Sequence, residues 1–240
     1  MKINDTNISV YNAKQLTVDI QSSNITNESI WLDNSINPLF LDSKFGFKEI
    51  TISLYMKETS RDSILINYSK LISSLSKKVT LEIDGYSHKF KAILKSNPTL
   101  TKTKSKYRYI AELKFEGYEY DNLASANIVN SNSGQIVNSG NIDTPCLLEI
   151  TSSTSFASAD ELVITGFTDN DIKIKNLEAD KTLIIDPCVV NDNYTTTVDN
   201  ENFFNNITMY EFPRLKAGNN SITINRDDIK IVAKYYPRFI

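Results

Sequence analysis

The sequence predicts a mainly β protein with one helix, divided into two domains. Short runs in which apolar and polar residues alternate dominate the chain, and this period is typical of half-buried strands. Only residues 64–75 carry apolar side chains at helical spacing. Charge is also uneven: residues 44–114 hold fifteen Lys or Arg, whereas residues 115–212 hold three against sixteen Asp or Glu. This asymmetry favours two domains with different surfaces.

The first half, residues 1–123, is predicted to place antiparallel strands around the helix. Residues 50–56 alternate and form a strand. Thr59 or Ser60 can cap the helix, which has Asp62 in its first turn and Lys77 and Lys78 near its end.

A hairpin follows the helix. Strands at 79–83 and 86–94 flank Asp84-Gly85, a pair typical of tight turns in which both residues have positive φ. Residues 95–106 are predicted to be a long loop, and residues 107–116 form a further strand. Hairpins in this order build an antiparallel sheet.

Residues 124–144 are predicted to be a linker, because small and polar turn residues dominate there. Residues 145–240 form a second, all-β domain. Its short strands recur roughly every 8–12 residues, as in a sandwich or jelly roll. They are predicted at 148–150, 162–164, 172–174, 183–185 and in two C-terminal runs, one at the end of residues 212–224 and one at 229–236.

Composition excludes several classes of protein. The 240 residues suffice for large cores without disulfides, so Cys146 and Cys188 are interpreted as buried free thiols. The net charge of −3 does not indicate a nucleic-acid binder. Apolar runs stay well below the roughly 18 residues of a membrane span.

The titratable residues do not assemble into a recognisable catalytic pattern. His88 is the single histidine and shares a predicted strand face with Tyr86 and Phe90, so a structural role is favoured over a general base. Asp84 and Asp186 fall in different predicted domains, which argues against a glycosidase pair.

Acidic turns leave a cation site as an alternative. Asp160-Glu161 and Asp169-Asn170-Asp171 could hold calcium, although Asp and Asn also favour turns for local reasons. We therefore expect no catalytic, cofactor-binding or metal-binding residue.

Two surface features suggest contacts with other molecules. Lys89, Lys91, Lys102 and Lys104 could track a nucleic-acid backbone, but a solvated or subunit-contacting surface is favoured, and a tube lumen is a third use. Trp31 lies in a polar region and is expected to pin an N-terminal arm to the core or to a neighbour.

The C-terminal run is the most specific pattern in the chain. Phe212-Pro213-Arg214-Leu215-Lys216-Ala217-Gly218-Asn219-Asn220-Ser221-Ile222 predicts a loop, a tight turn and a strand, and a short aromatic and basic strand follows. The pattern F-P-x-L-x-x-G-x-N-x-I resembles the C-terminal domain of phage distal tail proteins, the Dit family. Asn138-Ser139-Gly140 before Pro145, and Leu183-Ile184-Ile185-Asp186, are similar to further segments of that domain. The motif residues are Phe212, Pro213, Leu215, Gly218, Asn220 and Ile222.

The resemblance implies a structural virion protein of a phage tail tip. Its N-terminal domain would be β-sandwich or barrel-like and form a hexameric ring, and a galectin-like C-terminal domain would project outward. The ring would join the tail-tube protein to a tail-tip or tail-associated protein, and to a receptor-binding protein for host attachment. The family resemblance implies no enzyme activity, no cofactor, no membrane and no sequence-specific nucleic acid. The protein would be made in the host bacterial cytoplasm.

A carbohydrate-binding module or an adhesin domain is the alternative function. It would contact glycans of the host cell wall through exposed aromatic rings of the second domain. Tyr194, Phe203, Phe204 and Tyr210 are the candidates.

Overall fold

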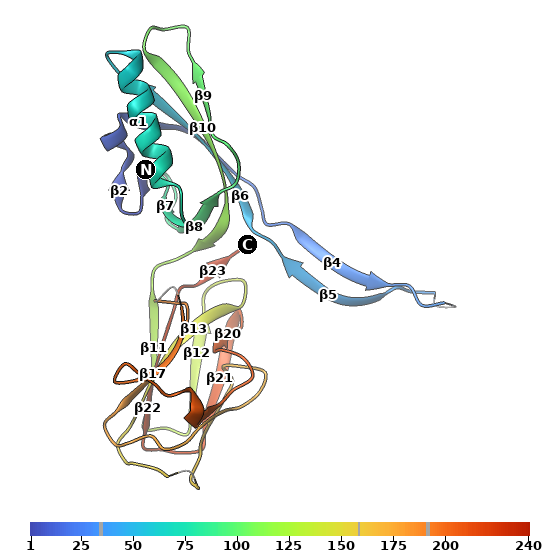
Figure 1. Cartoon of the computed structure of the whole chain (residues 1–240). Coiled ribbons are helices and arrows are strands. Elements are labelled where there is room, and N and C mark those ends of the chain that lie inside the picture. The colour runs from blue at the N-terminus through green and yellow to red at the C-terminus, as the bar shows by residue number, and fades with distance from the viewer. Residues whose placement is uncertain (34–35, 158, 191–192) are drawn as a thin grey trace. The chain divides into compact units, whose positions relative to one another are not determined.

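The computed structural model describes residues 1–33, 36–157, 159–190 and 193–240, and only the backbone of residue 42. The chain forms two compact units, one of residues 1–120 with residue 240, and one of residues 121–239 (Figure 1). Each unit has its own hydrophobic core. Within the described ranges, no helix has the length and apolar character needed to cross a membrane.

The first unit is an antiparallel sheet with one helix. Its strands run in the order β2-β1-β7-β8-β10-β6-β3, and β9 pairs with the early part of β10. The elements are β1 (Lys2–Ile3), β2 (Thr6–Asn7), the 3₁₀ turn Ile8–Tyr11, β3 (Ala13–Ile20), β4 (Ile25–Ile30), β5 (Leu39–Phe45), β6 (Lys48–Lys57), α1 (Arg61–Ser74), β7 (Val79–Glu82), β8 (Lys89–Leu94), β9 (Thr99–Lys102) and β10 (Arg108–Tyr120). Strands β4 and β5 pair with each other as a separate two-stranded sheet.

The central strands β6 and β10 carry the core of this unit. Ile50, Ile52, Leu54 and Met56 are fully buried, as the alternation in the sequence predicts. Ala111, Leu113 and Phe115 of β10 lie opposite them in register and share the same core. Burying one such aliphatic side chain stabilises a fold by roughly 1.5–3 kcal/mol, so this strand pair is a main source of stability.

The predicted helix is confirmed. The Ser60 hydroxyl caps it by accepting a hydrogen bond from the Ser63 backbone N–H at 3.1 Å. The helix buries Ile64 and Leu71, and Leu71 packs in the core of the sheet together with Leu75, just beyond the helix end. Lys77 and Lys78 follow the helix and do not belong to its last turn.

Two local expectations for this unit were wrong. Asp84-Gly85 is not a two-residue hairpin turn, because β7 and β8 are joined by residues 83–88 and only Gly85 of the pair has positive φ (+92°). The Tyr86 N–H bonds to the Ile83 carbonyl at 3.1 Å, which places Gly85 at the turn position that favours glycine. The predicted loop at 95–106 contains β9, whose backbone pairs with β10 although most of its side chains are polar.

The second unit consists of two antiparallel sheets. One has the order β11-β22-β13-β16-β17-β18, with β20 pairing with β13, and the other has the order β12-β21-β14-β15-β19. The elements are β11 (Ala124–Val129), β12 (Ser133–Asn138), β13 (Thr144–Ser152), β14 (Leu162–Thr165), β15 (Ile172–Ile174), β16 (Thr182–Pro187), β17 (Tyr194–Val198), β18 (Glu201–Asn202), the 3₁₀ turn Phe204–Asn206, β19 (Ile207–Thr208), β20 (Arg214–Leu215), β21 (Gly218–Ile224), β22 (Ile229–Tyr235) and β23 (Arg238–Phe239).

The two sheets enclose one core, which makes this unit a β-sandwich. Leu148, Ile150 and Ile231 come from one sheet, and Ile164 and Ile222 come from the other. Alternating short strands in the sequence predicted this architecture.

Residues 124–144, which the sequence analysis assigned to a linker, instead form strands of this sandwich. β11 pairs with β22, and β12 pairs with β21. Ile128 and Ile136 are the buried anchors of these two strands. The remaining side chains of β11 and β12 are mostly small or polar. The segment therefore has the composition of a linker, although it forms two strands.

Candidate assembly site: an apolar hairpin arm

Strands β4 and β5 form a projecting hairpin, called the arm below (residues 25–45). The backbone register joins Ile25 to Phe45 at the base and Ile30 to Leu39 towards the far end, with a bulge after Glu28. Cross-strand polar contacts support the hairpin: Lys44 Nζ lies 2.7 Å from Glu28 Oε1. The Ser43 hydroxyl donates to Asn27 Oδ1 at 2.7 Å. Both contacts lie between the base and the bulge.

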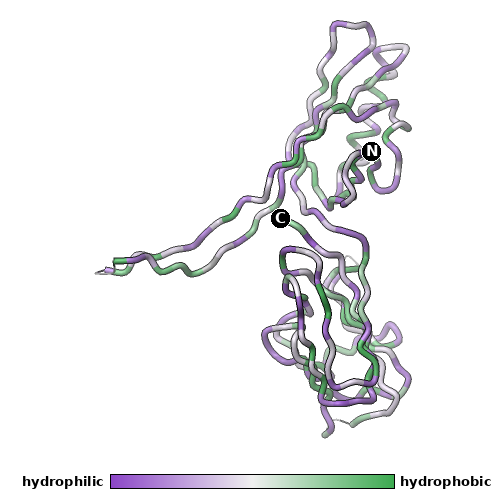
Figure 2. Tube along the Cα trace, turned by 180° about the vertical axis from the view of Figure 1, so that it is seen from behind, coloured by the Kyte–Doolittle hydropathy of each residue, from purple (hydrophilic) through white to green (hydrophobic). Residues whose placement is uncertain are grey.

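The arm exposes an unusual concentration of large apolar side chains. Trp31 is 65% exposed and Phe40 is 74% exposed. Hydrophobic colour follows much of the arm in Figure 2. The exposed apolar residues on and beside the arm are Ile25, Ile30, Trp31, Leu32, Ile36, Leu39, Phe40, Leu41, Phe45 and Phe47.

The arm has no core of its own. Every residue of β4 is exposed, and the two strands pair with each other alone in the described chain. An isolated two-stranded hairpin is at best marginally stable in water, and contiguous exposed apolar surface marks interaction sites. Exposed apolar surface of this kind is typical of a site of interaction with another protein. In the sequence, Trp31 was the one residue that pointed to an interaction site in this segment.

The four predicted lysines do not form one patch. Lys91 lies opposite Tyr118 and Lys102 lies opposite Tyr109, nine positions apart along β10. That spacing corresponds to about 30 Å. Strand alternation also places Lys89 and Lys91 on the sheet face opposite to Lys102.

The two pairs of lysines differ in their surroundings. Lys89 Nζ lies 2.7 Å from Glu82 Oε1, and this hydrogen bond raises the pKa of Lys89. Lys102 and Lys104 are exposed, in β9 and in the turn that follows it. Any subunit or lumen contact by these lysines would involve two separate surfaces.

The C-terminal motif forms the turn between β20 and β21, which side-chain hydrogen bonds of Asn220 stabilise. The Asn220 side chain is buried, and its Nδ2 donates to the carbonyls of Lys216 at 2.9 Å and Gly218 at 3.1 Å. Its Oδ1 accepts from the Lys216 N–H at 2.8 Å. Gly218 has a φ of +82°, which explains glycine there. Leu215 and Ile222 are fully buried, and Pro213 accepts a backbone bond from Cys146 at 2.9 Å.

The Asn138-x-Gly140 segment is a second turn that an asparagine side chain stabilises. Asn138 Nδ2 donates to the Ile142 carbonyl at 3.1 Å, and its Oδ1 accepts from the Gly140 N–H at 3.0 Å. A Cβ atom on Gly140 would lie 2.5 Å from the Arg238 carbonyl oxygen, so the backbone leaves no room for a side chain.

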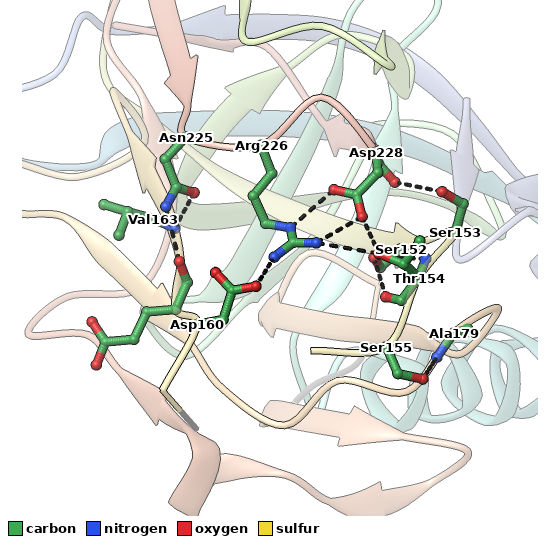
Figure 3. A network of polar contacts seen from close by, with 11 residues as sticks. Ser152, Ser153, Thr154, Ser155, Asp160, Val163, Ala179, Asn225, Arg226 and Asp228 are labelled. Carbon is green, nitrogen blue, oxygen red and sulfur yellow. Dashed lines mark hydrogen bonds and ion pairs between the residues drawn. The ribbon is translucent and has the colours of Figure 1, made fainter. Parts of the chain in front are cut away.

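The acidic turns are engaged in ion pairs. Arg226 holds Asp228 through Nε at 2.9 Å and Nη2 at 2.8 Å, and it reaches Asp160 at 2.6 Å (Figure 3). Asp169 lies 2.5 Å from Arg214 and 3.2 Å from Lys216. Among the residues that the structure describes, no group of three His, Cys, Asp or Glu side chains is placed to hold a metal ion.

The other titratable candidates also have structural surroundings. His88 Nδ1 lies 2.6 Å from Glu119, which Lys48 contacts at 2.6 Å. Burial raises the pKa of Glu119, but the bonds from Lys48 and His88 outweigh it and lower that pKa. Asp186 is buried in the second unit and accepts the Val189 N–H at 2.6 Å, while Asp84 belongs to the first unit.

Neither Cys146 nor Cys188 forms a disulfide in the described chain. Cys146 is buried, and burial raises the pKa of its thiol. Cys188 is only partly buried, which differs from the expectation of two buried thiols.

The aromatic candidates of the second unit fall into three groups. Tyr194 and Phe204 are exposed and line a common hollow together with Phe212. Phe203 packs against the core, so it is unsuited to stack on a ligand. Tyr210 is 81% exposed and stands outside this hollow.

Comparison with known proteins shows the fold. No protein-family model and no curated protein sequence matches the chain. The crystal structure of the SPP1 Dit (gp 19.1) protein, described as a paradigm of the hub adsorption apparatus in phages that infect Gram-positive bacteria, matches with a TM-score of 0.75. The identity is 11%, over 98% of this chain and 97% of that chain.

Two structures of the phage p2 baseplate in its activated conformation, with Sr and with Ca, are more distant. Their TM-scores are 0.48 and 0.47, at 14% identity, and each match covers 93% of this chain and 90% of that chain. With its helix-bearing sheet, its arm and its C-terminal sandwich, the chain has the fold of the SPP1 Dit protein.

Proposed function

We propose that this chain is a structural subunit of a phage tail tip. Six copies form a ring that joins the tail tube to the tip and receptor-binding apparatus. The observation that carries the proposal is the apolar arm, on a chain with the fold of the SPP1 Dit hub protein. Under this proposal the chain acts by assembly and has no catalytic residue.

A second copy of the chain is the occupant that suits the arm. In a closed ring each subunit presents one surface to its neighbour on one side and a different surface on the other. The arm supplies one such surface, and the main strand path of the first unit's sheet ends in the edge strands β2 and β3. Covering the arm removes many large apolar side chains from water, which is the main driving force of association.

The mass of the purified protein in solution tests the ring. We expect light scattering after size exclusion to give a species of six subunits. Trp31 is the single tryptophan and lies on the exposed arm, so its emission should shift to shorter wavelength on assembly. A chain that stays monomeric at its highest soluble concentration would contradict the ring.

A paired substitution tests the role of the arm. Phe40→Ser with Leu41→Ser should give a monomer whose free energy of unfolding is unchanged, because both side chains are already exposed. Val129→Ser with Val137→Ser, at exposed positions of the second unit, is the matched control and should still assemble. Assembly of the arm variant at the wild-type concentration would contradict this role.

The expected partners follow from the proposed position of the ring at the phage tail tip. The ring would contact the tail-tube protein on one side and a tail-tip, tail-associated or receptor-binding protein on the other. The protein would be made in the bacterial host cytoplasm and would function in the virion. Neither a membrane nor a specific nucleic-acid sequence is required.

A further inference from the structure

The second unit carries two adjoining hollows, which share Tyr194 and Phe212 and are called the aromatic groove below. The larger has a volume of about 580 Å³, and Pro145, Pro187, Glu211 and Arg214 also line it. The smaller, of about 380 Å³, is also lined by Asn202 and Phe204. A concave site with apolar walls and a few polar groups is the usual form of a small-ligand site.

The walls of the groove offer open aromatic faces. Tyr194 is 65% exposed and Phe204 is 50% exposed. The rings of Tyr194 and Phe212 lie 4.8 Å apart at an interplanar angle of 52°, so they form a tilted corner instead of a flat stack. One face of a pyranose ring presents C–H groups that pack on such aromatic faces, while its hydroxyls point outward.

The polar end of the groove carries a cluster of ion pairs. Arg214 Nη2 lies 2.5 Å from Asp169 and 3.3 Å from Glu211, and its Nε lies 3.8 Å from Asp143. Carboxylates fixed in this way keep lone pairs that can accept hydrogen bonds from ligand hydroxyls. Positions set before binding reduce the entropy that binding costs.

The charge at this end favours a neutral ligand. Asp143, Asp169 and Glu211 are matched in number by the cations Arg214, Lys216 and Arg238. Arg214 Nη2 contacts two carboxylates, whereas its Nε lies 3.8 Å from Asp143 and makes no hydrogen bond within the described residues.

A buried hydroxyl adds a second polar feature. Thr196 lines the smaller hollow, and its Oγ1 has no hydrogen-bond partner among the described residues. Buried polar groups are normally paired with protein, water or ligand. This hydroxyl is itself buried in the wall of the smaller hollow.

We propose that the aromatic groove binds a neutral saccharide, with a pyranose ring packed on Tyr194 and Phe204 and its hydroxyls bonded to Glu211 and Asp143. This inference goes beyond the proposed function and does not depend on ring assembly. It gives the second unit a ligand, while the arm of the first unit serves association.

Saturation-transfer NMR on the full chain tests the groove. The probes are maltotriose, chitotriose and a galactose trisaccharide, with glycerol 3-phosphate as the anionic probe. We expect at least one neutral trisaccharide to bind in the millimolar range or tighter, with transfer strongest at the C–H protons of one ring. Glycerol 3-phosphate should give no signal.

Three variants locate the binding. Tyr194→Ala should weaken binding about tenfold through loss of the stacking face, whereas Tyr194→Phe should retain it. Phe204→Ala, at an exposed position, repeats the test if Tyr194→Ala fails to fold. Tyr210→Ala is the matched control, because Tyr210 is exposed but does not line the groove.

The proposal is overturned by either of two results. One is the absence of binding by all three neutral trisaccharides. The other is undiminished binding by both Tyr194→Ala and Phe204→Ala.

Discussion

At the scale of single residues, two asparagines complete the hydrogen bonding of the second unit. Asn220 satisfies backbone groups of the turn between β20 and β21, and Asn138 does the same for residues 140–142. The sequence predicted a turn at each place from its Gly and Asn residues. It could not show that each side chain folds back under its own turn, because that depends on burial by strands distant in sequence.

Asn220→Ala should destabilise the second unit by about 2–3 kcal/mol, since it leaves buried backbone groups without partners. Urea unfolding followed by circular dichroism measures the loss. Asn219→Ala, at the exposed neighbouring position of β21, is the control and should change little. Equal stability of the two variants would show that the Asn220 bonds are dispensable.

The Arg226–Asp228 pair predicts acid sensitivity. Hydrogen bonds from Arg226 lower the pKa of Asp228, although burial raises it. A depressed pKa in the folded state stabilises the fold above the unfolded value of about 3.9, and this stabilisation is lost as pH falls below it. The melting temperature of Asp228→Asn should therefore lie below that of the wild type at neutral pH, with the gap closing in acid.

Asp171→Asn, at an exposed position, serves as the control for this series. Its melting temperature should follow the wild type across the same pH range. A gap between Asp228→Asn and the wild type that stays constant with pH would contradict the assigned pKa shift.

At the scale of elements, a helix or strand can be predicted from the sequence when it buries one of its faces. Strands β6 and β10 and helix α1 each bury one face, so their apolar residues recur at the period of the element. The arm buries no face of β4, and its apolar residues follow neither period. β9 has the same difficulty, since Leu100 is its one core contact. The arm and β9 are defined by backbone pairing, and the spacing of apolar residues in the sequence does not reveal such pairing.

Chymotrypsin should distinguish the free arm from the covered arm. It cleaves after large apolar and aromatic residues, which are exposed on the arm at Trp31 and Phe40. Exposed segments with few tertiary contacts open readily and are cut first. We expect early cleavage after Trp31 or Phe45 in the monomeric arm variant, after Phe40 as well in a dissociated wild-type chain, and protection in the assembled species. Equal cleavage in both states would contradict burial of the arm.

At the scale of the whole molecule, the chain has two cores and two kinds of surface. The charge asymmetry in the sequence predicted two domains. The structure places the boundary at Tyr120–Asp121, before strand β11 instead of after a long linker. Composition alone cannot place such a boundary when the first strand of a domain is made of small and polar residues.

Each unit should fold separately, because each has its own core. Residues 121–240 expressed alone should unfold cooperatively and remain monomeric. Residues 1–120, which retain the arm, should form the six-subunit species. Calorimetry and light scattering measure the two properties, and a ring formed by residues 121–240 alone would assign assembly to the wrong unit.

The shape of the arm also has a kinetic consequence. Strands of six and seven residues extend for about 20 Å, so the arm reaches about that far along its own length. Orientational constraint is what slows most protein encounters below the diffusion limit. If the arm makes the first contact, a subunit is captured before its rigid surfaces are aligned, and alignment becomes a step within a tethered pair. In the proposed ring, the concentration that limits growth would then be the effective concentration set by the arm, and this would favour completion of a started ring over initiation of a new one.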